Sequence, residues 1–317
     1  MSSTTIPTAS SALDGAARLP TAGPIVVGTP GDEGEAALET VRRLVAYDGR
    51  AVSVVSALEL PTLDVSVAGV PYVPDVEEYA ATRRERVARQ LRAAGEVPNT
   101  WPVTVSGDDP AHAIADAARA ASASLIVVGA GHHDVTARLF GEVAVRVARH
   151  APCPVLAVAR EPMRVPPHVA VAAIDFSPSS VIAARAARDL LAPGGTLHLV
   201  HVWRRHAVDT PAHAEQDAAY ERALPERFAR VERELLDHPR DIAIVPASLQ
   251  GDPVERLTAF AWSHVADVMA AGRQGHTLLE RLFVGRVTTG LLRAAPCALL
   301  VTPEPALGAA DLVASNA

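Results

Sequence analysis

The sequence contains no lysine, and arginine supplies all 29 of its basic residues. This absence excludes three kinds of site that depend on a lysine amine. A Walker A loop places a lysine on the β- and γ-phosphates of a nucleotide, and a protein kinase needs a lysine on one strand. Schiff-base and pyridoxal chemistry form their covalent bond on a lysine nitrogen. The protein belongs to none of these classes.

Cysteine is almost as scarce. Only Cys153 and Cys297 are present, each in an Ala-Pro-Cys context, and they lie 144 positions apart. Their matching contexts predict two equivalent core thiols rather than a bridge. We therefore expect a reducing, cytoplasmic compartment, where structural disulfides are rare.

Long apolar runs and an excess of basic charge are also missing. No run approaches the roughly 18 residues that a membrane helix needs, and the N-terminus lacks a basic region followed by an apolar one. The formal net charge is −7 and the pI about 5.9, which argues against nucleic acid as the main partner. We expect a protein without a membrane or nucleic-acid partner, and 317 residues are enough for two domains of roughly 150 each.

Short apolar runs alternate with helical patterns through the chain, and the order repeats once. The strands predicted in the first half are 24–29, 50–57, 100–105, 125–129 and 155–158, and those in the second half are 168–175, 196–202, 241–246, 266–271 and 299–301. The apolar run 265–269 is expected to be buried in the fourth strand of the second half. The helices with the clearest patterns are 32–46, 77–94, 110–121, 178–191 and 214–237.

This alternation predicts an α/β protein with two tandem doubly wound parallel-sheet domains, since strands that read as continuous apolar runs are covered on both faces. The predicted organisation is a disordered tail over 1–22, a first domain over 23–160, a linker over 161–167, a second domain over 168–303 and a tail over 304–317. In such sheets, ligands bind beyond the carboxyl ends of the strands, where the strand order reverses.

A glycine-punctuated segment follows the fourth strand of the second repeat. Gly272, Gly275 and Gly285 have the spacing Gly-x2-Gly-x9-Gly, and a helical pattern follows. Glycine lets the backbone approach a ligand closely, and the unpaired N–H groups at a helix start suit a phosphate. Each glycine alone is more typical of a turn or a helix cap. The spacing after a strand indicates a phosphate loop.

The spacing resembles the nucleotide loop of the universal stress protein family, whose pattern is Gly-x2-Gly-x9-Gly-Ser/Thr. The resemblance covers nearly the whole chain, once in each repeat, and implies the adenine-nucleotide α-hydrolase-like fold. It also implies an ATP, ADP or AMP ligand, with or without Mg. One position departs from the family pattern, because Arg286 stands where the family has Ser or Thr. Its guanidinium could grip a phosphate bidentately or fill the phosphate pocket.

The resemblance implies a set of ligand contacts in the second repeat. Asp175 would contact the adenine or ribose, with a helix N-cap as the alternative role, and Val202 would offer only its backbone. The implied nucleotide-binding residues are Ala173, Ile174, Asp175, Val202, Gly272, Gly275, Gly285, Arg286, Val287 and Thr288.

The first repeat departs further from the family pattern. Thr29 is taken to stand where Asp175 stands, and Glu142 replaces the phosphate-contacting Ser or Thr. Gly129 and Gly131 are separated by one residue rather than two, although nine residues still precede Gly141. We expect a degenerate site that does not hold ATP; a nucleoside without phosphates is the alternative ligand.

Other chemistry has weaker candidates. His198 and His201 are three apart on one strand, so they face opposite sides and do not form a metal site. His132 and His133 lie together in the first loop without further ligands. No Gly-x-Ser-x-Gly elbow is present, and neither cysteine lies in a context that favours a nucleophile. We therefore predict no metal and no catalytic residue.

The predicted function is adenine-nucleotide binding, chiefly in the second repeat, by a stress-response regulator or sensor that signals to an unidentified protein partner. Any ATP hydrolysis would be slow. The alternatives are a nucleotide-free scaffold and an enzyme of the wider nucleotide α-hydrolase-like group, which would need an added catalytic segment. In the family, the fifth strand pairs across a two-fold interface. The two repeats are therefore expected to pair within the chain as a pseudo-dimer, with an ordinary edge strand or a homodimer as alternatives.

Overall fold

The computed structural model describes residues 23–31, 34–58, 76–94, 101–129, 142–206, 210–236, 241–273 and 284–304. The chain divides into two compact units, formed chiefly by the described residues of 23–166 and of 167–304. The predicted tails at 1–22 and 304–317 lie outside the described residues, apart from Glu304.

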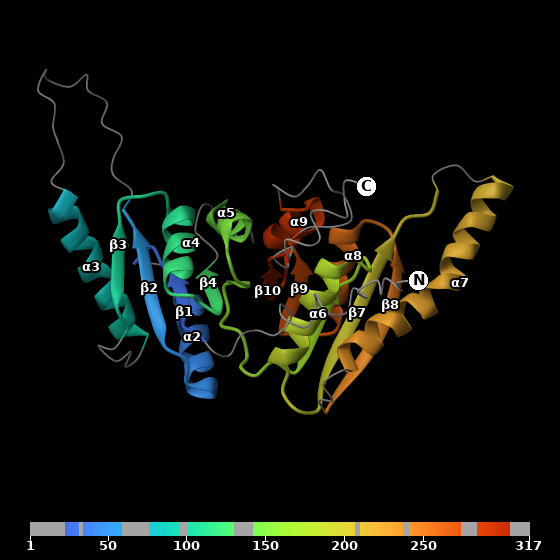
Figure 1. Ribbon diagram of the computed structural model, residues 1–317, viewed down its shortest axis with the longest axis horizontal. Helices are drawn as coiled ribbons and strands as arrows, with labels where there is room; N and C mark the ends of the chain where they lie inside the picture. Colours follow the sequence, from blue (N-terminus) through green and yellow to red (C-terminus); the bar gives the residue numbers. More distant parts are fainter. Residues whose placement is uncertain are drawn as a thin grey trace, which may run out of the picture. The chain divides into compact units, whose positions relative to one another are not determined.

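The first unit alternates parallel strands and helices, as predicted. Its elements are β1 (Ile25–Gly28), α2 (Glu35–Asp48), β2 (Val52–Ala57), α3 (Val76–Ala93), β3 (Val103–Ser106), α4 (Pro110–Ala120), β4 (Leu125–Gly129), α5 (Glu142–His150) and β5 (Val155–Val158). The strand order is β3-β2-β1-β4-β5, and Figure 1 shows β3, β2, β1 and β4 in this order. Val26 pairs with Ser53 on one side and with Ile126 on the other, so the order reverses between β1 and β4.

The second unit repeats this plan. Its elements are β6 (Val169–Ala173), α6 (Pro178–Leu190), β7 (Gly195–Trp203), α7 (Pro211–Leu236), β8 (Ile242–Gln250), α8 (Pro253–Ser263), β9 (Val268–Gly272), α9 (Arg286–Ala294) and β10 (Ala298–Thr302). The strand order is β10-β9-β6-β7-β8, and the order reverses between β6 and β9. The fold class predicted from the repeated pattern is confirmed. The predicted pairing of 155–158 with 299–301 concerns the relation of the two units and stays a prediction.

The central strands form the core of each unit, because their side chains are covered on both faces. In the first unit, Ile25, Val26, Val27, Ile126 and Val127 are fully buried.

The edge strand β8 of the second unit is more exposed than the central strands. Its residues alternate between half-buried and exposed, and it contains Pro246 opposite Leu199. Proline cannot donate to a ladder, so it is tolerated at the edge of a sheet.

Several predicted strand boundaries differ from the observed ones: the strand predicted over 168–175 ends at Ala173, and the one predicted over 100–105 begins at Val103. Two further errors lie in the second unit. Val265 does not belong to the fourth strand of the second unit: it is 81% exposed, has a φ of 49° and donates its N–H to the carbonyl of Trp262 in the turn after α8. The prediction was wrong because Val265 is apolar and lies just before the apolar residues of β9. The third strand does not stop at Pro246 but continues to Gln250 beside Trp203.

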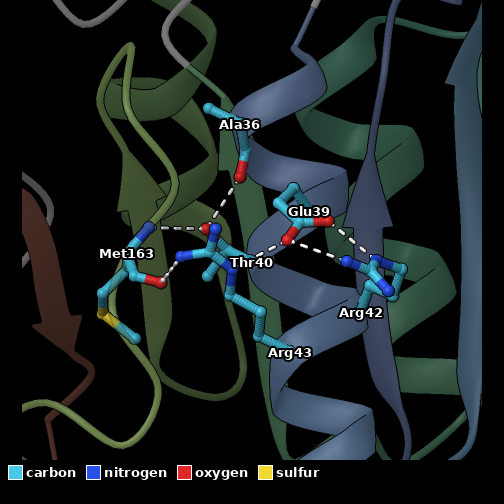
Figure 2. A network of polar contacts seen from close by, with 6 residues as sticks. All are labelled: Ala36, Glu39, Thr40, Arg42, Arg43 and Met163. Atoms are coloured by element: carbon cyan, nitrogen blue, oxygen red, sulfur yellow. Dashed lines mark hydrogen bonds and ion pairs between the residues drawn. The ribbon is translucent and has the colours of Figure 1, made fainter. Parts of the chain in front are cut away.

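The beginning of the predicted linker is anchored on α2 of the same unit (Figure 2). The N–H of Met163 donates to Thr40 Oγ1 at 2.9 Å, and the Met163 carbonyl accepts from Arg43 at 3.2 Å. Thr40 and Met163 are both buried, and Thr40 Oγ1 in turn donates to the carbonyl of Ala36. The chain is therefore held against α2 through Met163 before it enters the second unit.

His198 and His201 contact different helices, which confirms that they lie on opposite faces of β7. The His198 ring packs edge-on against Phe260 and His264 of the α8 region, with centroids 5.3 and 4.8 Å away. His198 Nδ1 is buried and has no hydrogen-bond partner among the described residues. Burial, together with the nearby His264, lowers the pKa of His198.

This shift predicts a pH dependence of stability. The unfolded chain binds a proton at His198 near its ordinary pKa of about 6.5, whereas the folded protein resists protonation until a lower pH. The free energy of unfolding should therefore decrease as the pH falls below about 6.5. Urea unfolding of His198→Leu between pH 7.5 and 5.5 should show a shallower decrease than the wild type. The exposed-site variant His168→Gln is the control, and a wild-type slope in His198→Leu would contradict the assignment.

Candidate functional site

The candidate site begins where the chain leaves β6. The Asp175 carboxylate lies two residues after this strand and accepts from the N–H of Ser177 at 3.0 Å and from its hydroxyl at 2.5 Å. Ser177 is the N-cap of α6, and its Oγ accepts from the N–H of Ser180. Ser177, and not Asp175, is therefore the residue that caps α6. Asp175 stabilises the turn that precedes the helix and positions Ser177.

Phe176, next to Asp175, sits in the left-handed region with a φ of 65°. Few residues other than glycine adopt this conformation, so surrounding contacts must hold it. The Phe176 ring lies 4.7 Å from the ring of His201 and 5.3 Å from that of Phe228 on α7. The turn that carries Asp175 is therefore packed between β7 and α7.

His201 connects this turn to α7 by hydrogen bonds. Its Nδ1 lies 2.7 Å from the carbonyl oxygen of Ile174, and its Nε2 lies 2.8 Å from the hydroxyl of Tyr220. A carbonyl can only accept, so Nδ1 carries the proton, and in the neutral form of the ring Nε2 then accepts from the Tyr220 hydroxyl. The ring is buried, so this tautomer satisfies both of its nitrogens.

Two cations at the site were not anticipated from the sequence. Arg227 on α7 holds its guanidinium 5.5 Å from the Phe176 ring centre and 5.3 Å from that of Tyr220. Arg273 follows Gly272, and burial lowers its pKa, while Glu304 opposes the shift. Arginine remains charged at neutral pH even so. The sequence offered one indication of Arg273, its position between Gly272 and Gly275. No sequence pattern indicated that Arg227 lies near the site.

Val202 directs its backbone toward the Asp175 turn. The carbonyl of Val200 accepts from Ile174 on the β6 side, and that of Trp203 accepts from Gly251 on the β8 side. Neighbouring residues of a strand point their backbone groups in opposite directions, so Val202 faces the same side as Val200. Because β6 ends at Ala173, this backbone lies next to the chain that follows β6.

Gly272 ends β9 and touches the first turn of α6. A Cβ at this position would lie 2.3 Å from Ser179 Oγ and 2.8 Å from the Ser179 backbone carbon. No side chain fits at that distance. Glycine therefore allows the start of α6 to approach the end of β9, and this contact brings Asp175 and the glycine segment to one switch point.

The start of α9 closes the same site. Gly285 donates its N–H to the carbonyl of Arg273 at 2.8 Å, and its own carbonyl accepts from Thr289. Arg286, Val287 and Thr288 thus form the first turn, where backbone N–H groups have no intrahelical acceptor. The Thr288 side chain is buried and donates to the Gly272 carbonyl at 2.7 Å, whereas Arg286 is exposed.

The predicted site residues are therefore distributed over three neighbouring places. Ala173, Ile174 and Asp175 lie at the end of β6, Val202 lies on the adjacent strand, and Gly272, Gly285 and the first turn of α9 lie at the end of β9. Gly275 lies outside the described residues. The hydroxyl of Thr288 joins β9 to α9, so its contribution to a ligand would come from its N–H.

The first unit differs at the corresponding switch point, and the predicted equivalence of Thr29 with Asp175 is wrong. The N–H of Thr29 donates to Val55, the strand partner of Gly28, just as the N–H of Ile174 donates to Val200, the partner of Ala173. Thr29 therefore corresponds to Ile174, and Pro30 corresponds to Asp175. Proline offers neither a carboxylate nor an N–H. The polar groups of the first unit at this point therefore differ from those of the second unit more than the sequence suggested.

The side chain of Thr29 has a structural role. Its Oγ1 donates to Gln90 Oε1 on α3 at 2.7 Å, and both residues are buried. Glu142 begins α5, where a carboxylate suits the helix dipole. Gly131, Gly141, His132 and His133 lie outside the described residues.

Among the described residues, no group of three or more His, Cys, Asp or Glu side chains could hold a metal ion. Cys153 and Cys297 are free thiols, and burial raises the pKa of Cys153 to about 12. A thiol with so high a pKa is a poor nucleophile. Among the described helices, none has the length and apolar character needed to cross a membrane.

Strand order, switch points and repeat define a tandem doubly wound α/β protein. The model of the universal stress protein family matches residues 22–159 and 168–303. The chain therefore belongs to the universal stress protein family, and it carries two tandem domains of that family. A search of curated proteins found no significant match.

Solved structures agree on the fold over nearly the whole chain. A universal stress protein from Archaeoglobus fulgidus DSM 4304 is 19% identical, with a TM-score of 0.58, over 91% of this chain and 98% of that one. A functionally unknown protein from Pseudomonas aeruginosa PAO1 is 16% identical, with a TM-score of 0.60, over 93% of this chain and 96% of that one. A shorter universal stress protein solved in complex with cAMP covers 43% of this chain, at 21% identity and a TM-score of 0.31.

The contact between Gly272 and Ser179 predicts a specific loss of stability. In Gly272→Ala, the added methyl group would meet backbone atoms of α6, so the free energy of unfolding should fall by about 1–3 kcal/mol. Gly107→Ala is the matched control, because a Cβ there has no neighbour within 4 Å. Urea unfolding of both variants measures the difference. Equal effects at the two positions would contradict the close approach of β9 and α6.

Proposed function

We propose that the second unit binds an adenine nucleotide, ATP or AMP, and that the protein acts as a stress-response regulator or sensor. The observation that carries this proposal is the convergence of three kinds of group at one switch point. They are the Asp175 carboxylate, the backbone of Val202 and the N–H groups that begin α9. Switch points of doubly wound sheets are the usual ligand sites of this architecture.

Each group has a chemical counterpart in the ligand. A carboxylate accepts from an exocyclic amine or a ribose hydroxyl, and an exposed strand backbone can pair with the edge of a base. The first-turn N–H groups of α9, with the helix dipole, favour phosphate. The charges of Arg273 and Arg286 add to this preference, and Mg could accompany a triphosphate. The proposed boundaries of the binding domain are residues 168–303, and those of its degenerate counterpart are residues 23–160.

The second candidate function is a nucleotide-free scaffold of the same fold. One observation favours it: the Thr288 hydroxyl, which lies in the helix turn expected to meet the phosphates, already donates to the Gly272 carbonyl. The first unit has Pro30 at the position of Asp175, and it is therefore consistent with a scaffold that binds no nucleotide. Under the main proposal, only the second unit responds to nucleotide.

The test is a calorimetric titration of the purified chain with ATP, ADP and AMP, run beside Asp175→Asn. The amide keeps an oxygen that can accept from Ser177, so the turn is preserved while the charge is lost. Affinity should fall about tenfold or more, as expected when a hydrogen bond to a charged group is lost.

Asp109→Asn is the matched control, since Asp109 is a helix-capping carboxylate of the first unit. It should bind like the wild type. Absence of binding by the wild type would refute the proposal and favour the scaffold. Binding that survives unchanged in Asp175→Asn would place the nucleotide elsewhere.

A further inference from the structure

In the second unit, a chain of hydrogen bonds links α7 to the peptide group that precedes Asp175. Tyr220 donates to His201 Nε2 at 2.8 Å, and His201 Nδ1 donates to the carbonyl of Ile174 at 2.7 Å. That carbonyl belongs to the planar peptide unit shared by Ile174 and Asp175. Holding its oxygen therefore restricts the direction in which the Asp175 side chain leaves the backbone.

Aromatic contacts support the same connection. Tyr220 packs against Trp203 with centroids 5.3 Å apart, and Phe176 rests on His201 and Phe228. The unusual φ of Phe176 means that the turn needs such support on the side of α7. Removing only the Tyr220 hydroxyl would leave these ring contacts in place.

The C-terminal half of α7 is more buried and makes more contacts with α6 than its N-terminal half. Its C-terminal end is held by two buried arginines of α6: Arg185 donates to the carbonyl of Glu234 at 3.0 Å, and Arg188 donates to that of Leu235. The buried residues of α7 are Leu224, Phe228, Val231 and Leu235. Tyr220 lies about one turn before the first of them. Its hydroxyl therefore connects the less buried N-terminal half of the helix to the site.

The first unit makes the corresponding link without His201. There, Ser56 occupies the position of His201, and its buried hydroxyl has no hydrogen-bond partner among the described residues. Thr29 instead reaches Gln90 on α3 directly. Both units thus tie the end of their first strand to their second helix. Only the second unit makes this tie through the carbonyl that precedes a carboxylate.

We propose that Tyr220 is a positioning residue for nucleotide binding, which acts through His201 and the Ile174 carbonyl to orient Asp175. This inference rests on the proposed function. It makes α7 part of the site without requiring that Tyr220 touch the ligand.

The experiment compares ATP affinity and thermal unfolding in Tyr220→Phe, His201→Asn and the double variant. The Asn amide nitrogen can take the place of imidazole Nδ1 and keep the bond to Ile174, but its side chain is too short to accept from Tyr220. Each single variant should weaken ATP binding about two- to tenfold, the range expected for one neutral hydrogen bond. The double variant should be no weaker than His201→Asn, because Tyr220 acts only through His201.

Tyr47→Phe, which removes an exposed tyrosine hydroxyl from the first unit, is the control and should bind ATP like the wild type. A purely structural role would lower the unfolding temperature of Tyr220→Phe but leave its affinity unchanged, and that result would overturn the inference while the proposed function stands. Additive losses in the double variant would likewise overturn it. A wild type that binds no nucleotide would overturn the proposed function and this inference together.

Discussion

The candidate site depends on the close approach of β9 and α6. At Gly272 the end of the strand touches the Ser179 backbone, and a single added carbon would force the two elements apart. α6 begins directly after the Asp175 turn, and the Thr288 hydroxyl ties α9 to the Gly272 carbonyl. The positions of the carboxylate and of the helix start that would receive phosphate are therefore linked through one glycine.

The two units share a fold but differ in the polar groups at the switch point. Strand order, register and the tie between the first strand and the second helix recur in both. In the first unit, Pro30 and Ser56 replace Asp175 and His201. The packed sheet and its helices are common to both units, whereas a few polar groups at the switch point differ, and the function of a fold depends on such groups.

Most of the fold could be predicted from the sequence, because buried parallel strands read as apolar runs separated by helical patterns. Errors arose where an apolar residue directly precedes an apolar strand, as Val265 does, and where a proline was taken to end a strand, as at Pro246. They also arose where a one-residue shift leaves the pattern intact, as with Thr29 and Pro30. The glycine segment and Asp175 could be located because they lie close to strand ends. Tyr220 and Arg227 could not, since they reach the site from a long helix whose rotation and height no local pattern determines.

Hydrogen exchange of the full chain with and without ATP tests the central claim, that the second switch point and not the first holds the nucleotide. The account predicts slower exchange with ATP in peptides covering residues 173–180, 200–204 and 284–290. Peptides covering 25–31 and 142–150 should exchange at the same rate in both samples. Protection confined to the first unit, or equal protection of both, would contradict the account.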